Sequence, residues 1–130
     1  MLEAANIRDE AIWAKVRYAL SYVKDIRGGD WMPEDVFAAC SRGEAFLFMA
    51  EEGFVILKPM RNDFTGAPFL LVWMAYGEGG DCIDKYQDDL IEIARQAGYL
   101  RLQFWRRPRG EVSAKGWQKQ YTIYELEIPE

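Results

Sequence analysis

The chain has 130 residues, of which 50% are hydrophobic and 15% are aromatic. This composition predicts one globular domain spanning residues 1–130, and it excludes a disordered chain, which has too little apolar surface to fold. The start of the sequence is polar, no apolar run reaches about 20 residues, and the formal net charge is −5. We therefore expect a cytoplasmic protein that contacts no membrane and does not bind nucleic acid in general.

The first predicted element is an amphipathic helix from Asp9 to Lys24. Its apolar residues recur at spacings of four and three, which places them on one helical face. This face consists of Ile12, Val16, Leu20 and Val23. A second helix is predicted to begin at Pro33 and to stop at Gly43, because proline is tolerated in a first turn and glycine ends helices.

Three short apolar segments follow, from Ala45 to Ala50, from Phe54 to Leu57 and from Phe69 to Tyr76. The first two are separated by Glu51-Glu52-Gly53 and predict a β-hairpin. All three runs are nearly continuous instead of alternating with polar residues. Continuous runs are typical of strands that helices cover on both faces.

A glycine-rich turn at residues 77–80 precedes a predicted helix from Asp81 to Ala97, and a strand from Leu100 to Trp105 follows. Strand, helix and strand of this length predict a right-handed parallel crossover. A short helix near residues 110–115 and a last strand from Tyr121 to Ile128 complete the chain. Together these elements predict an α/β (α+β) fold.

The order of the elements resembles the GNAT acetyltransferase superfamily over residues 9–128. The resemblance implies a mixed central sheet with helices on both faces. It also implies that the strands Phe69–Tyr76 and Leu100–Trp105 separate and that acetyl-coenzyme A lies between them. Acetyl-coenzyme A is therefore the expected cofactor, and transfer of an acyl group to an amine is the expected activity.

The phosphate-binding signature of that superfamily, Q/R-x-x-G-x-G/A, falls on the sequence YGEGGD at residues 76–81. Small residues let a pyrophosphate approach backbone N–H groups at the positive end of a helix. Tyr76 and Asp81 depart from the signature, and an aspartate at this place is an ordinary N-cap, so a capped turn is the alternative. The resemblance implies four cofactor-binding residues, namely Tyr76, Gly77, Gly79 and Gly80.

Many members of the superfamily carry a tyrosine as general acid a few residues before a Gly-Phe pair. Gly116-Trp117 is similar to that pair and places Val112 at the tyrosine position. Valine cannot donate a proton. Tyr121 and Tyr124 are therefore the catalytic candidates, with core packing as the alternative role of both.

The chain contains no histidine, and its two cysteines, Cys40 and Cys82, lie far apart in the sequence. Neither zinc ligation nor a Cys-His nucleophile is predicted from them, so we expect buried free thiols and no metal. Other polar and aromatic groups are assigned to solvated faces or to the core. The acids Glu51, Glu52, Asp84, Asp88 and Asp89 are expected to be solvated, and Trp31, Met32 and Trp73 to be core residues, with pocket lining as the alternative.

Basic residues gather between residues 101 and 120, a segment with six basic residues and one acidic residue and therefore a net charge of +5. The rest of the chain has ten basic and twenty acidic residues, a net charge of −10. Arg106, Arg107 and Arg109 form the densest part of this segment. Such arginines bind an anionic partner or neutralise the acids of their own domain, and both roles stay open.

Two functions remain open at this stage. One is a divergent N-acetyltransferase acting on an unidentified acceptor. The other is a non-catalytic binding or structural protein that joins a protein partner or forms a homo-oligomer. The chain is also similar to small, aromatic-rich GNAT-like proteins of phages. If it is encoded by a phage, the virion is a second expected location besides the cytoplasm.

Overall fold

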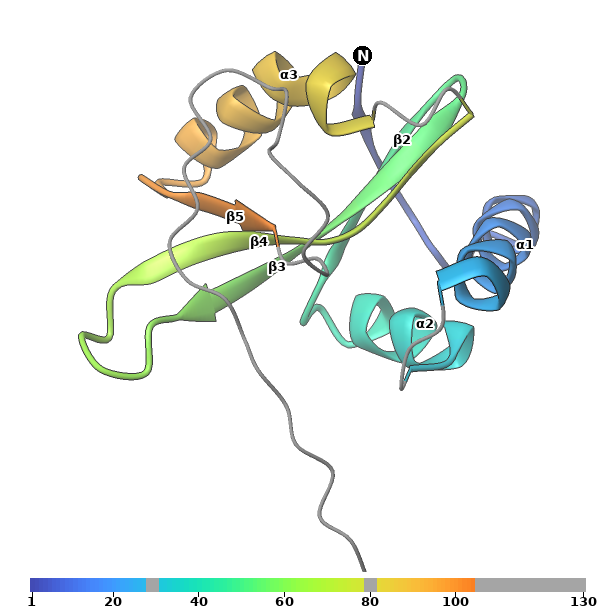
Figure 1. Ribbon diagram of the computed structural model, residues 1–130, viewed down its shortest axis with the longest axis horizontal. Helices are drawn as coiled ribbons and strands as arrows, with labels where there is room; N and C mark the ends of the chain where they lie inside the picture. The colour runs from blue at the N-terminus through green and yellow to red at the C-terminus, as the bar shows by residue number, and fades with distance from the viewer. Residues whose placement is uncertain (28–30, 79–81, 105–130) are drawn as a thin grey trace, which may run out of the picture.

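A computed structural model describes residues 1–27, 31–78 and 82–104. The described residues form five strands and three helices (Figure 1). In chain order they are β1 (Glu3–Ala5), α1 (Glu10–Arg27), α2 (Pro33–Ser41), β2 (Phe46–Ala50), β3 (Gly53–Arg61), β4 (Pro68–Gly77), α3 (Cys82–Gln96) and β5 (Leu102–Phe104). The predicted helix near 110–115 and the strand Tyr121–Ile128 lie outside the described residues.

The five strands form one mixed sheet in the order β1-β2-β3-β4-β5. The pairs from β1 to β4 are antiparallel, and β5 runs parallel to β4. The predicted hairpin and the predicted parallel crossover are therefore both confirmed. β1 was not predicted from the sequence, because three residues are too few to produce a periodic pattern.

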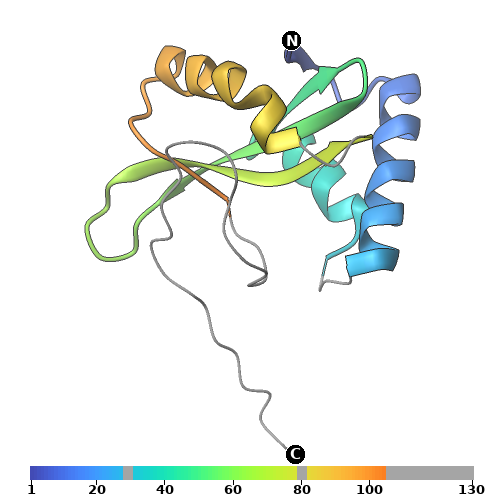
Figure 2. The same cartoon turned by 45° about the horizontal axis from the view of Figure 1, so that its top comes forward.

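Helices cover both faces of the sheet, as predicted: α1 and α2 lie on one face and α3 on the other (Figures 1 and 2). This arrangement divides the buried side chains into two clusters. The α1/α2 core consists of Ile7, Val16, Ala19, Leu20, Val36, Ala39, Ala45, Leu47, Phe54 and Ile56. The α3 core consists of Leu2, Val55, Leu57, Leu70, Val72, Tyr86, Leu90 and Ala94.

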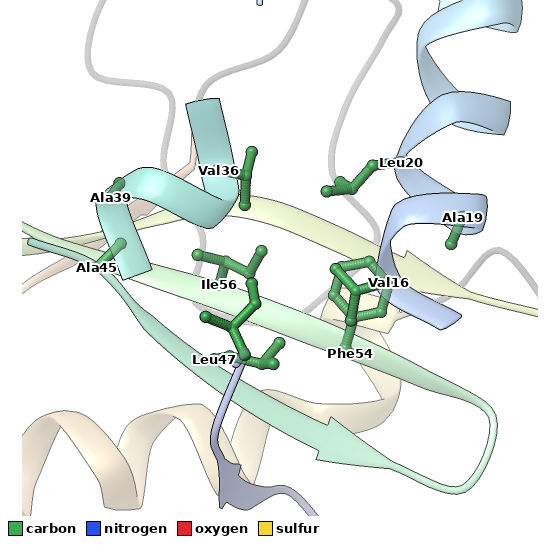
Figure 3. Packing of buried hydrophobic residues seen from close by; sticks show 10 residues of the cluster. Val16, Ala19, Leu20, Val36, Ala39, Ala45, Leu47, Phe54 and Ile56 are labelled. Atoms are coloured by element: carbon green, nitrogen blue, oxygen red, sulfur yellow. The ribbon is translucent and has the colours of Figure 1, made fainter. Parts of the chain in front are cut away.

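Figure 3 shows how the α1/α2 core closes, with Val16, Leu20 and Val36 directed toward the sheet. α1 begins where the Asp9 carboxylate accepts hydrogen bonds from the backbone N–H groups of Ala11 (3.0 Å) and Ile12 (3.2 Å). The predicted apolar stripe of α1 is confirmed. The helix predicted from Asp81 to Ala97 corresponds to α3, which ends at Gln96; Ala97 is exposed, and the buried face of the helix ends at Ala94.

None of the described helices is both long and apolar enough to cross a membrane.

The close approach of β3 and β4 at the end of the sheet depends on Gly53. Gly53 pairs with Gly77, and a Cβ at Gly53 would lie 2.0 Å from the carbonyl oxygen of Tyr76. A backbone oxygen cannot rotate out of the way, so only a residue without a side chain fits. Gly66, in the β3–β4 loop, is needed for a different reason, because its φ of +71° is a left-handed conformation with open space around it.

We expect Gly53→Ala to lower the free energy of unfolding by about 3 kcal/mol, since the added methyl group must push two strands apart. Gly66→Ala serves as the matched control and should cost about 1 kcal/mol, the price of a left-handed conformation alone. Urea unfolding of both variants measures the difference. A Gly53→Ala protein as stable as Gly66→Ala would contradict the close approach.

Candidate functional site

β4 contains one residue more than the stretch of β3 that it faces. Ile56 pairs with Met74, but Leu57 pairs with Val72, so Trp73 is the extra residue. This is a β-bulge, which bends the strand and increases its twist.

The bulge also changes which way the side chains of β4 face. Val72 packs in the α3 core, whereas Trp73 and Met74, although adjacent, both pack against the α1/α2 core. In a regular strand, neighbouring side chains alternate between the two faces. The reversal therefore begins at Met74, directly after the extra residue Trp73, and carries through to Tyr76, which also packs against the α1/α2 core.

The described pairing between β4 and β5 reaches as far as the bulge. Leu70, Leu71 and Val72 pair with Leu102, Gln103 and Phe104, and the next residue of β4 is Trp73. β4 continues to Gly77, and among the described residues its part after Val72 has no partner strand on the β5 side. The bulge thus bends β4 at the residue that follows its last described pair with β5.

The structure describes two of the four predicted cofactor-binding residues. The ring of Tyr76 lies against Phe54, with centroids 5.8 Å apart, so its side chain is directed into the α1/α2 core. Gly77 is the last residue of β4. Gly79, Gly80 and Asp81 lie outside the described residues, so the phosphate-binding role of this turn stays a prediction.

The turn between β2 and β3 carries a carboxylate that contacts α3. Oε1 of Glu52 accepts a hydrogen bond from the Tyr86 hydroxyl at 3.4 Å and forms an ion pair with Lys85. The backbone carbonyl of Glu52 accepts a hydrogen bond from the N–H of Glu78 at 3.0 Å. Glu52 therefore contacts the chain on both sides of residues 79–81.

The expectation that Glu52 is merely solvated is wrong. No local pattern in the sequence reveals this contact, because its partners lie more than 30 residues further along the chain. Glu51, beside it, is exposed as predicted.

α3 is kinked at Tyr86, whose φ of −107° and ψ of 15° lie outside the helical range. Tyr86 is only 5% exposed and packs in the α3 core. The kink separates the first turn of α3 from the rest of the helix. Glu52 holds this first turn through Lys85 and fixes the kink through Tyr86, so the hairpin turn sets the position of the start of α3.

The acids of α3 do not gather into a site. Asp84 and Asp88 are exposed, and Asp89 accepts a hydrogen bond from the backbone N–H of Leu2 at 3.1 Å, which ties β1 to α3. Residues 1–27, 31–78 and 82–104 contain no group of three or more acidic, cysteine or histidine side chains arranged to hold a metal ion.

An open groove of about 570 Å³ lies elsewhere, at the β1 edge of the sheet, between β1, the first half of α1 and the end of β2. Four of its nine lining residues are alanine, and the others include Ile12 and Met49 and the polar residues Glu3, Asn6 and Lys15. Neither the bulge nor the contact of Glu52 with α3 is part of this groove, so we place the candidate site at Trp73 and the start of α3.

Of the three residues expected in the core, Trp31 and Trp73 pack partly buried against the α1/α2 core, whereas Met32 is 51% exposed. The expectation of a core position therefore holds for the two tryptophans and is wrong for Met32.

Cys40 is a free cysteine on α2 and is half-buried. Burial raises the pKa of its thiol to about 11, because the thiolate would lose contact with water. The reactive thiolate is therefore scarce near neutral pH. The expectation of a free thiol is confirmed for Cys40, although the residue is half-buried and not fully buried.

Alkylation of Cys40 by iodoacetamide at pH 8 should be on the order of 100-fold slower in the native protein than in urea, since only the thiolate reacts and its pKa falls on unfolding. A Cys82→Ser variant leaves Cys40 as the sole thiol, and mass spectrometry follows the reaction. The native rate should rise with pH up to about pH 11. A native rate within tenfold of the rate in urea would argue against the raised pKa.

Glu52→Ala should loosen the first turn of α3, because both side-chain contacts of the carboxylate are lost. Hydrogen exchange of the amides of residues 86–89, the helical positions whose N–H groups donate to carbonyls of this turn, should become about five- to tenfold faster, the effect of losing about 1 kcal/mol of local hydrogen bonding. Glu51→Ala is the matched control and should change nothing. Equal exchange in the two variants would mean that Glu52 does not hold the turn.

The chain was compared with known proteins. No protein-family model matches it, and no curated protein matches it. Solved structures do match. A "probable acetyltransferase" is 18% identical with a TM-score of 0.69, over 100% of this chain and 99% of that chain.

Two other similar structures are named more specifically. The ribosomal-protein-alanine N-acetyltransferase of Brucella melitensis biovar Abortus 2308 is 17% identical, with a TM-score of 0.60, over 95% of this chain and 99% of that chain. An aminoglycoside acetyltransferase from an uncultured soil metagenomic sample, in complex with sisomicin, is 10% identical with a TM-score of 0.60, over 98% of this chain and 96% of that chain. At these identities the likeness shows the fold.

Proposed function

We propose that this chain, which has the GNAT fold, binds acetyl-coenzyme A and transfers its acetyl group to an amine. The observation that carries the proposal is the bulge at Trp73, directly after the last described pair of β4 and β5. The structural neighbours support the same class of reaction, since several are named acetyltransferases and one is named an N-acetyltransferase.

The backbone of β4 fits the pantetheine arm of coenzyme A. That arm is a chain with two amide groups, and amides bind along an open strand edge as an added strand does. Residues 73–77 offer such an edge among the described residues. The pyrophosphate would follow at Gly77, Gly79 and Gly80, where backbone N–H groups precede the start of α3.

Bound acetyl-coenzyme A supplies an activated acetyl group as a thioester. In the transfer, the amine nitrogen bonds to the acetyl carbon, the C–S bond breaks, the amine loses one proton and the departing thiolate takes one. The chain has no histidine, so its proton donors and acceptors are carboxylates, lysines, tyrosines or water. The candidates Tyr121 and Tyr124 lie outside the described residues.

The alternative is a non-catalytic protein that keeps the fold for binding or structure. It is favoured by Asp81 and Val112, which stand where the superfamily has a small residue and a proton donor. In this case the anionic partner would bind Arg106, Arg107 and Arg109. Binding of acetyl-coenzyme A separates the two functions.

Millimolar acetyl-coenzyme A should raise the melting temperature, because a ligand that binds only the native state stabilises it. At about 100 times Kd, the added stability is about 2.7 kcal/mol, which corresponds to several degrees for a domain of this size. Differential scanning fluorimetry measures the shift.

Gly79→Asp should abolish the shift, since it adds bulk and negative charge among the amides that bind phosphate. Asp81→Ala should increase the shift, because it removes a competing carboxylate. Ala67→Asp, in the exposed β3–β4 loop, adds the same charge elsewhere and should leave the shift unchanged. The absence of a shift in wild type would contradict the proposed acetyltransferase function.

A further inference from the structure

A lysine lies over the tryptophan of the bulge. Nζ of Lys58 is 4.8 Å from the ring centroid of Trp73, a cation–π contact. Lys58 pairs in register with Leu71, two residues before the bulge. Both Lys58 and Trp73 are half-buried. The pair is therefore fixed at the place where the described pairing of β4 with β5 ends.

The alternation of the strands puts Lys58 on the face of the sheet opposite α3. Its neighbour Leu57 packs in the α3 core, so Lys58 faces the other way, as does Leu71 between Leu70 and Val72. Gln103 lies between Leu102 and Phe104, which pack against the α3 core, and so faces the same way. Lys58, Leu71 and Gln103 thus form one row across three strands.

The row combines apolar and polar side chains. Leu71 is 3% exposed, and Trp73 beside it packs against the α1/α2 core. Lys58 and Gln103 are the polar members on either side of Leu71. Binding sites for small molecules are mostly apolar and contain a few polar groups that fix the orientation of the ligand.

Lys58 has no carboxylate partner among the described residues. The ion pairs there involve the N-terminus, Arg17, Arg42, Lys85 and Arg95. Lys58 is half-buried as a residue, and an ammonium group beside partly buried apolar surface attracts an anion more strongly than one in bulk water does.

We propose that Lys58 binds a carboxylate of the acetyl acceptor, with Trp73 supporting the carbon chain between that carboxylate and the reacting amine. The inference rests on the proposed function, which places the acetyl group between β4 and β5. The anion that Lys58 binds belongs to the acceptor and is not a phosphate of coenzyme A, because those phosphates would lie at the start of α3 and Lys58 is on the opposite face of the sheet. The acceptor class is therefore an amine that carries a carboxylate.

The experiment compares amines in pairs that differ only in a carboxylate or a carboxamide: glycine with glycinamide, β-alanine with β-alaninamide, and γ-aminobutyrate with its amide. Saturation-transfer NMR measures binding of each pair in competition, and release of free coenzyme A measures acetyl transfer. In wild type the carboxylate member should be preferred about tenfold, the effect of one charge-assisted hydrogen bond. The polyamine spermidine should bind more weakly than any carboxylate.

Lys58→Gln should bring the preference close to one, and Lys58→Arg should keep it. Both variants should retain the thermal shift with acetyl-coenzyme A, because Lys58 does not face α3. The proposal is overturned if wild type does not prefer the carboxylate members or binds none of them. It is also overturned if Lys58→Gln prefers them as strongly as wild type does. Loss of the wild-type thermal shift is a separate result, and it counts against the proposed function instead.

Discussion

The site depends on a single extra residue in β4, and the sequence around it explains why the sheet tolerates this. An inserted residue turns every later side chain of a strand to the opposite face. In a strand that alternates apolar and polar residues, the insertion would drive polar groups into the core. β4 instead reads PFLLVWMAYG, and helices cover both of its faces, so either orientation buries an apolar side chain. The continuous apolar run therefore both fills two cores and permits the bulge.

The bulge acts together with a second constraint, the contact of Glu52 with α3. The bulge bends β4 where its described pairing with β5 ends, and Glu52 fixes the first turn of the helix that follows β4. Gly53 and Gly77 hold the turn of the hairpin against the end of β4, which keeps Glu52 within reach of Lys85. The end of the β2–β3 hairpin thus positions both the end of β4 and the start of α3.

Most of the fold could be predicted from the sequence because its signals are local. The periodicity of α1, Pro33 at the start of α2 and the apolar runs of β2 to β4 each act within a few residues. The parts that could not be predicted depend on distant contacts. A bulge leaves no mark in a continuously apolar run, the partners of Glu52 lie on another element, and β1 is too short to show a period. Ala97 was misassigned because periodicity does not show where a helix leaves the core.

The charge around the glycine turn also differs from what the sequence indicates. Glu52, Glu78 and Asp81 are close in sequence or in space to the amides that would bind a pyrophosphate, and three negative charges would repel it. The ion pair with Lys85 offsets the charge of Glu52, and the Tyr86 hydroxyl donates to the same oxygen. The repulsion that remains comes from Glu78 and Asp81. Lys58 lies on the face of the sheet opposite α3, whereas Glu52 makes its contacts with α3, so the cation of the bulge and the carboxylate of the hairpin turn do not offset each other.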